Sequence, residues 1–272
     1  MGSGIAFSTA VALAAQAAIN TAPASLRPIT PWNVDYADRL CILQRFYGTT
    51  DAPVTLGFKP GLFSDIIRVI IVTKGSATNT VRGVARVSFD GGAEFDARFA
   101  EGFIEGRGVR ALVMDVNTSE LAPLNRAKQI RVKAGKVDLS FALFAVPVAM
   151  KALDVCQKDL LVKWGMDAKI VASIASFPTQ RNGIASIFST NDYPMSAVRN
   201  GEQGTAGVKF WVSKEGKARD CEVVESSGSK VLDQQSCSII VQRSHFEPAR
   251  TAAGEPVESI AYQRIRWELP GI

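Results

Sequence analysis

Four cysteines and one histidine are the residues of this 272-residue sequence whose side chains offer the clearest chemistry. The cysteines are Cys41, Cys156, Cys221 and Cys237, and none belongs to a CxxC motif. With His245 as the sole imidazole, the roughly four clustered ligands of a structural zinc site are not available. Disulfides in an oxidising compartment suit these cysteines better. We predict a Cys221–Cys237 bridge, because both lie in one short segment, and by elimination a Cys41–Cys156 bridge; four buried free thiols are the alternative.

The lone histidine is also a candidate general base. Ser244 precedes His245, but adjacency in sequence does not bring a nucleophile, a base and an orienting acid together. The acidic residues within 90–96 lack the spacing of a calcium loop, and the glycines of 102–108 lack the strand-to-helix setting of a phosphate loop. We therefore expect a non-enzymatic protein with no metal and no cofactor. A hydrolase whose site lies in the N-terminal domain is the alternative, which loss of activity on changing His245 to Ala would support.

The composition is that of a folded globular protein. Apolar residues make up 47% and charged residues 21% of the chain, so a packed core is expected. The net charge is only +5, and no run of Lys and Arg reaches the density of a nucleic-acid-binding patch. We expect neither nucleic acid nor a small-molecule substrate as ligand.

The start of the chain has the pattern of a secretory signal peptide. Residues 5–18 form an apolar stretch that is shorter than the roughly 20 residues of a membrane-spanning helix. Small-x-small sites follow at 15–17 and 22–24, as at signal-peptidase cleavage sites. We predict a cleaved signal peptide over 1–24 and a periplasmic location.

Residues 31–166 are predicted to form a β-rich domain of unknown function that ends in a helix. Turn residues separate alternating or β-branched runs about every ten positions, as in antiparallel β domains. The expected strands lie at 54–58, 66–73, 83–89, 111–116, 129–132 and 137–144. Over 145–164 the apolar residues then recur at helical spacing, with Cys156 on the apolar face. The polar segment 168–190 is predicted to be a linker with one short ordered piece at 184–188.

The last part, 191–272, is predicted to be a small β-β-α-β domain, which makes the whole chain α+β. A hairpin is expected over 207–225, a helix over 230–243 with Ser229 as its N-cap, and a final strand over 257–269. The expected buried stripe of the helix is Val231, Leu232, Cys237, Ile240 and Val241.

This C-terminal segment resembles the TonB C-terminal domain family. The residues that carry the resemblance are Tyr193-Pro194 with Ala197, Gly204, Val208 to Val212 (VKFWV), Gly216, Val223-Val224, Ser226-Ser227-Gly228, Leu232-Asp233, Phe246-x-Pro248-Ala249 and Gly254-x-Pro256-Val257. The sequence departs from the family at 203–206, where Gln-Gly-Thr-Ala stands in place of the usual Glu-Gly-Thr-Val. The cysteine pair of this segment is not general to the family either.

The resemblance implies a periplasmic binding module that takes up a partner peptide as an added strand. In this mode, main-chain hydrogen bonds supply affinity and alternate side chains supply specificity. The implied contact residues are Glu258, Gln263, Arg264 and Arg266 on the last strand, with Tyr193, Pro194 and Ala197 ahead of the first.

The implied partner is an outer-membrane receptor or another envelope protein, as in TonB-dependent transport. A self-associating structural envelope protein is the alternative, with the last strand pairing to its own copy in a homodimer. The charges of that strand could also serve to prevent aggregation, and Tyr193-Pro194 could be a turn that packs on the sheet. We do not extend the resemblance to energy transduction, because no spanning helix and no Pro-rich spacer precede the module.

Overall fold

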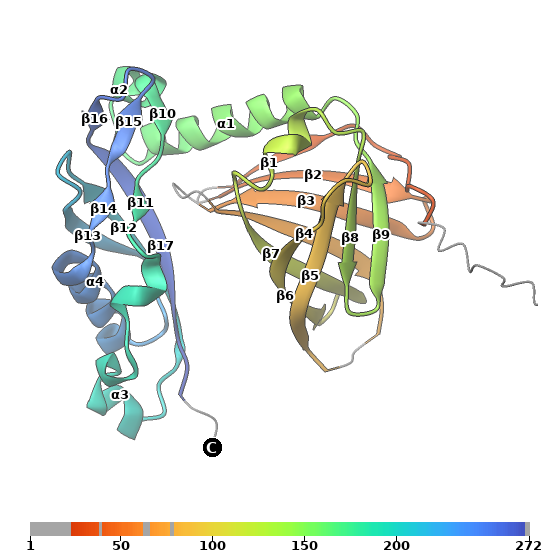
Figure 1. Cartoon of the computed structure of the whole chain (residues 1–272). Helices are drawn as coiled ribbons and strands as arrows, with labels where there is room; N and C mark the ends of the chain where they lie inside the picture. The colour runs from red at the N-terminus through yellow and green to blue at the C-terminus, as the bar shows by residue number, and fades with distance from the viewer. Residues whose placement is uncertain (1–22, 38–39, 62–65, 77–78, 270–272) are drawn as a thin grey trace, which may run out of the picture.

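The computed structural model describes residues 23–37, 40–61, 66–76 and 79–269. Its two parts are a large N-terminal sheet and a smaller C-terminal module, which one long helix joins (Figure 1). The predicted signal peptide lies outside the described residues except for its last two positions. The strand-rich α+β class expected from the sequence is confirmed.

Nine antiparallel strands form the N-terminal sheet in the order β1-β2-β3-β4-β7-β6-β5-β8-β9. Their bounds are β1 (Asn33–Ala37), β2 (Leu40–Gly48), β3 (Pro53–Pro60), β4 (Ile66–Lys74), β5 (Val81–Phe89), β6 (Phe95–Ile104), β7 (Val109–Asn117), β8 (Gln129–Ala134) and β9 (Val137–Ala142). Side chains alternate between core and surface, so that Ile67, Val69 and Ile71 of β4 are buried.

The six strands expected in this part are present, and β1, β2 and β6 are additional. Strand β6 gives a weak signal in the sequence because its inward positions include the small Ala97 beside Phe99. Asp96 and Arg98 point outward from the same strand. The difference in hydrophobicity between its inward and outward positions is therefore too small to distinguish the strand from a polar loop.

Residues 26–29 connect the two ends of this sheet. The Leu26 amide donates to the Ser140 carbonyl of β9 at 2.7 Å, and the Ile29 amide donates to the Phe46 carbonyl of β2 at 2.9 Å. The segment therefore covers backbone groups that β9 would otherwise expose. The largest fully buried side chains of the interior include Tyr47, Phe58 and Phe141.

The C-terminal module has the predicted β-β-α-β order. Its sheet runs β13-β12-β17, with β12 (Gly204–Val212), β13 (Ala218–Glu225) and β17 (Ser259–Trp267). Helix α4 (Lys230–Arg243) packs against one face of this sheet. The Ser229 hydroxyl accepts from the Leu232 amide at 3.3 Å, which is the predicted N-cap.

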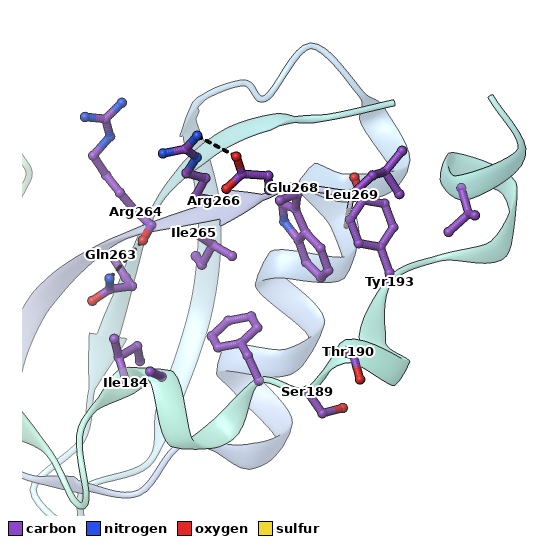
Figure 2. A pocket seen from close by; sticks show the side chains of 14 residues that line it. Ile184, Ser189, Thr190, Tyr193, Gln263, Arg264, Ile265, Arg266, Glu268 and Leu269 are labelled. Atoms are coloured by element: carbon purple, nitrogen blue, oxygen red, sulfur yellow. Dashed lines mark hydrogen bonds and ion pairs between the residues drawn. The ribbon is translucent and has the colours of Figure 1, made fainter. Parts of the chain in front are cut away.

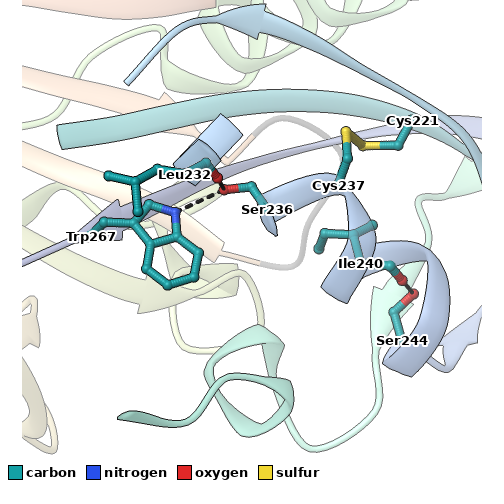
Figure 3. Close-up of a disulfide and its surroundings, with 7 residues drawn as sticks. All are labelled: Cys221, Leu232, Ser236, Cys237, Ile240, Ser244 and Trp267. Atoms are coloured by element: carbon teal, nitrogen blue, oxygen red, sulfur yellow. Dashed lines mark hydrogen bonds between the residues drawn. A yellow bond between two sulfur atoms is a disulfide. The ribbon is translucent and has the colours of Figure 1, made fainter. Parts of the chain in front are cut away.

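A disulfide joins the sheet of the module to its helix (Figure 3). Cys221 of β13 and Cys237 of α4 are bonded, with 5.5 Å between their Cα atoms. Cys41 and Cys156 are bonded as well, with Cα atoms 6.1 Å apart. Both predicted disulfides are thus present.

The buried face of α4 differs from the predicted stripe. Leu232 and Ile240 are buried as expected, but Val231 is 36% and Val241 43% exposed. Ser236 and Ile239 are buried instead, because positions i+4 and i+7 from Leu232 share its face of the helix.

Ser236 is tolerated in this core because its hydroxyl is fully used. It donates to the Leu232 carbonyl at 2.8 Å and accepts from the indole N–H of Trp267 at 2.8 Å (Figure 3). A buried hydroxyl with two partners avoids the penalty of an unsatisfied polar group. Trp267 is therefore a core residue of the module.

Short elements fill the rest of the chain. They are η1 (Ala122–Asn125), α2 (Ala168–Ser173), β10 (Ile174–Ser176), β11 (Thr179–Gln180), η2 (Ile184–Ile187), η3 (Thr190–Asp192), α3 (Met195–Arg199), β14 (Phe246–Glu247), β15 (Ala249–Thr251) and β16 (Pro256–Val257). The segment 168–190, expected to be a linker, contains β10 and β11, which pair with β15 and β14 of the module. Each of these elements is too short for its apolar residues to show a helical or strand period in the sequence.

Helix α1 (Val146–Lys163) is attached to both parts of the protein (Figure 1). Its first half packs into the N-terminal core through Val146, Ala149 and Leu153, and the Cys156 disulfide joins it to β2. Its last turn belongs to a separate apolar cluster.

That second cluster contains residues of α1 and of β17. Leu160 and Leu161 pack with Met166 and Ile260, and the Trp164 ring lies 5.8 Å from the Tyr262 ring. Because α1 is bonded to β2 through Cys156 and packed on β17 through its last turn, it holds the two parts at a defined relative position.

The turn glycines of the module make a testable pair. Gly216 has a φ of +80°, and a Cβ there would lie 1.9 Å from the Phe246 carbonyl oxygen of β14. Gly254 has a φ of +84°, but a Cβ there would meet no atom within 4 Å. We expect Gly216→Ala to lower the free energy of unfolding by about 3 kcal/mol and Gly254→Ala by about 1 kcal/mol, since only the first adds a clash to the backbone strain. Urea denaturation measures both, and equal midpoints for the two variants would contradict the analysis.

Candidate binding site along strand β17

Strand β17 lies at one edge of the C-terminal sheet. It pairs with β12 in continuous register from Gly204↔Trp267 to Val212↔Ser259. Among the described residues, no strand pairs with its other side. An edge strand of this kind leaves the N–H and C=O groups of every second residue outside the ladder.

The contact made by Ile260 indicates which backbone groups point outward. Its N–H donates to the Met166 sulfur at 3.3 Å, and therefore points away from β12. Backbone groups alternate in direction along an antiparallel strand, so those of Arg264 and Arg266 also point away from β12. Met166 covers the first part of the edge, and the part around Arg264 and Arg266 can accept another strand.

A cavity of about 600 Å³ lies beside this open part of β17. The segment 184–193 forms its opposite wall, on which Figure 2 shows Ile184 and Tyr193. The apolar side chain of Phe188 lines the same wall. The strand contributes Gln263, Arg264, Ile265, Arg266 and Trp267, followed by Glu268 and Leu269. The apolar side chains of the wall thus lie across the cavity from the outward main-chain groups of β17.

A second cavity of about 740 Å³ continues the first. The two share Ile184, Gln263 and Arg264. On its far side, the second cavity is lined by the N-terminal sheet through Lys59, Pro60, Ile66, Arg68, Asp115 and Asn117. The two cavities form one continuous groove along the open edge, which we call the β17 groove.

The guanidinium groups that line the β17 groove are paired with carboxylates. Arg264 pairs with Glu225 at 3.1 Å, Arg266 with Glu268 at 2.9 Å, and Arg68 with Asp115 at 2.7 Å. All six side chains are at least one-third exposed, so each pair contributes less than about 1 kcal/mol to stability. Their larger effect is to balance charge within the groove.

The sequence-predicted contacts on β17 divide into two groups. Gln263, Arg264 and Arg266 line the groove. Glu258 lies outside it, at the start of the strand, where its carboxylate accepts from the Arg219 guanidinium of β13 at 2.7 Å. Glu258 is therefore not part of the groove, and its role as a contact stays a prediction.

The predicted contacts ahead of β12 are mainly structural. The Tyr193 ring packs edge-to-face on Trp267, 5.3 Å between centroids, and its hydroxyl donates to the Glu202 carbonyl at 2.5 Å. Burial, followed by the Glu202 charge, raises the pKa of Tyr193. Pro194 is the N-cap of α3. Ala197 is fully buried, so a partner cannot contact its side chain, and we assign it to the core instead.

Two sets of groove residues were not identified from the sequence. Ile184 and Phe188 belong to a short apolar piece within a polar segment, and that apolar piece was their only signal. Lys59 and Arg68 lie about 200 positions before β17 in the sequence, and no local pattern connects them to that strand. Their approach depends on how α1 packs.

The wall of the groove is fastened to α4. The Asp192 carboxylate accepts from the Arg243 guanidinium at 2.7 Å and from the Ser189 amide at 2.7 Å. The hydrogen bond from Arg243 is the main cause that holds the pKa of Asp192 below its ordinary value, and the Ser189 bonds act in the same direction. The segment 184–193 is therefore held by charge-assisted bonds as well as by packing.

The two side chains considered for catalysis are directed to different partners. His245 Nδ1 lies 3.2 Å from the Lys217 ammonium nitrogen. The Ser244 hydroxyl instead donates to the Ile240 carbonyl at 2.5 Å, and Figure 3 shows both of these residues. Within the described ranges, no group of three His, Cys, Asp or Glu side chains is placed to hold a metal ion. In the same residues, no helix has the length and apolarity to cross a membrane.

The C-terminal module is thus a three-stranded sheet that carries one helix and has an open edge at β17. The sequence model of the family described as "Gram-negative bacterial TonB protein C-terminal" matches residues 189–269, so this part of the chain is a TonB C-terminal domain, as the motifs predicted. The solution NMR structure of the Pseudomonas aeruginosa TonB CTD is similar at 25% identity, over 29% of this chain and 79% of that chain, with a TM-score of 0.26. No curated protein matches the chain.

Acid should loosen the groove wall. Because the folded pKa of Asp192 is lowered, its contribution to stability is complete above the ordinary value of 3.8 and is lost as the pH falls below it. We expect Asp192→Asn to lower the urea midpoint at neutral pH and to reduce its fall between about pH 5 and about pH 3.

The matched control for this experiment is Asp154→Asn. Asp154 is an exposed acid of α1 that pairs with Lys158 at 3.0 Å, far from the wall in the sequence. The control should keep the pH dependence of the wild type. Curves of the same shape for Asp192→Asn and the wild type would overturn the assignment.

Proposed function

We propose that this chain is a periplasmic protein that binds an extended segment of an outer-membrane receptor or another envelope protein at β17. The observation that carries the proposal is the outward direction of the Arg264 and Arg266 backbone groups beside an apolar wall. A partner strand would extend the sheet from three strands to four.

The groove suits an extended peptide because it offers two kinds of contact. Main-chain bonds to Arg264 and Arg266 would each contribute about 1 kcal/mol net and would fix the partner's register. Alternate partner side chains would pack against Ile184 and Phe188, where burial of apolar area adds affinity. Main-chain pairing is indifferent to sequence, so selectivity would come from the walls.

The envelope location rests on three supports. The family matched by residues 189–269 is described for Gram-negative TonB proteins. The two disulfides fit an oxidising compartment. The first 24 residues have the pattern of a secretory signal. A role in TonB-dependent transport is the finer part of this proposal.

Strand addition makes one substitution diagnostic. Arg264→Pro removes an outward N–H while leaving the ladder to β12 intact, a position at which an edge strand tolerates proline. We expect it to reduce partner capture by at least about tenfold. Capture is measured in cells by photo-cross-linking from a reactive amino acid at position 268, with the full chain expressed.

Arg264→Ala is the matched control, because it removes the side chain and keeps the N–H. It should retain capture to within about threefold, since exposed ion pairs contribute little. Equal capture by the proline variant and the wild type would contradict strand addition. Adducts between two copies of the chain alone, with a dimer in analytical ultracentrifugation, would favour the self-associating structural protein instead.

Export can be tested separately from binding. A fusion of residues 1–30 to a reporter that is active only in the periplasm should be active, because the apolar stretch and the small-residue sites direct secretion. A fusion in which Leu13 is changed to Arg should be inactive. Equal reporter activity in the two fusions, or none in the first, would remove the periplasmic assignment.

A further inference from the structure

The N-terminal sheet contributes a row of charged residues to the β17 groove. Lys59 of β3 lies opposite Arg68 of β4, and Arg68 lies opposite Asp115 of β7. All three line the second cavity together with Tyr262 and others of the module. Cross-strand neighbours share one face of a sheet, so the row is presented to the groove as a unit.

The position of this row relative to β17 is set by covalent and apolar contacts. The Cys41–Cys156 disulfide fixes α1 on β2, and the cluster of Leu160 and Leu161 with Ile260 fixes the last turn of α1 on β17. These two attachments therefore hold the N-terminal sheet beside the β17 groove.

Charge within the second cavity is not balanced at Lys59. Arg68 has Asp115 and Arg264 has Glu225 as carboxylate partners, whereas among the described residues no carboxylate forms an ion pair with Lys59. The Lys59 side chain is also partly buried. A partly buried ammonium group beside two other cations is an attractive site for an anion.

The protonation behaviour of this group agrees with its surroundings. Burial lowers the pKa of Lys59 below its ordinary value, and the guanidinium groups of Arg264 and Arg68 lower it further against the weaker opposing effect of Glu225. A carboxylate placed beside Lys59 would compensate both the lost hydration and the repulsion.

We infer that the N-terminal sheet is the second wall of the binding site, and that Lys59 selects an extended segment with an Asp or Glu side chain. This inference rests on the proposed strand addition at β17. Side chains of an added strand alternate between two sides. The segment recognised would therefore direct apolar side chains toward Ile184 and Phe188 and a carboxylate toward Lys59.

Selection from displayed peptides tests this inference without a known partner. A library of random linear peptides of about twelve residues, long enough for an added strand, is selected on the full chain. It is selected in parallel on Lys59→Gln and Lys59→Glu. Lys74→Glu is the matched control, because it makes the same charge change at the exposed end of β4. Arg264→Pro identifies the peptides that need the open edge.

The expected result is an acidic residue at a fixed place in the edge-dependent peptides selected on the wild type. For one such peptide, Lys59→Glu should weaken binding by about tenfold and Lys74→Glu should leave it unchanged. Changing the peptide's acid to its amide should weaken binding to the wild type and have no effect on Lys59→Gln, which isolates the pair.

Two failures are distinguishable. Peptides that bind Arg264→Pro as well as the wild type would overturn strand addition. Peptides that need the open edge but show no acidic preference, or that bind Lys59→Glu as tightly as the wild type, would overturn the role of Lys59 alone.

Discussion

Because α1 is bonded through Cys156 to Cys41 and packed through Leu160 and Leu161 against Ile260, the two parts of this protein meet in a fixed way. The groove depends on that double attachment, since one of its walls comes from each part. The disulfide closes a separation of 115 residues, which on the chain-entropy account stabilises by about 5 kcal/mol. The apolar cluster then orients the C-terminal module on the helix. Without either attachment, Lys59 and Arg68 would have no defined relation to β17.

The open edge is a second constraint, and it accounts for the side chains that surround β17. A strand edge that can accept a partner can also aggregate. Here Met166 covers the beginning of the edge, and charged side chains at Arg264, Arg266 and Glu268 border the rest. The wall segment 184–193 is fastened by Asp192 to Arg243. The edge thus remains available only inside a shaped groove, where a partner must fit the walls as well as the backbone.

Within the module, two buried polar groups connect the walls of the groove to α4. Ser236 joins Trp267 to α4, and Asp192 joins the wall to the same helix. These bonds hold both sides of the groove relative to one helix, which the second disulfide also joins to β13. A binding surface made of short segments obtains its rigidity from such cross-connections. The short segments of the module are therefore held in place by these bonds to α4 as well as by their own packing.

The sequence by itself determined the β-β-α-β order of the C-terminal module, both disulfides, the Ser229 cap and the family of residues 189–269. Those features depend on local pattern, spacing and motif, which the chain carries in consecutive residues. It misassigned the buried face of α4, where Ser236 is accepted because Trp267 happens to reach it. It also proposed Ala197 and Glu258 as contacts, whereas the structure buries Ala197 in the core and places Glu258 outside the groove, paired with Arg219. The tertiary structure alone decided that Ile184 and Lys59 face the same strand, because contacts between residues far apart in sequence follow from packing and leave no local pattern.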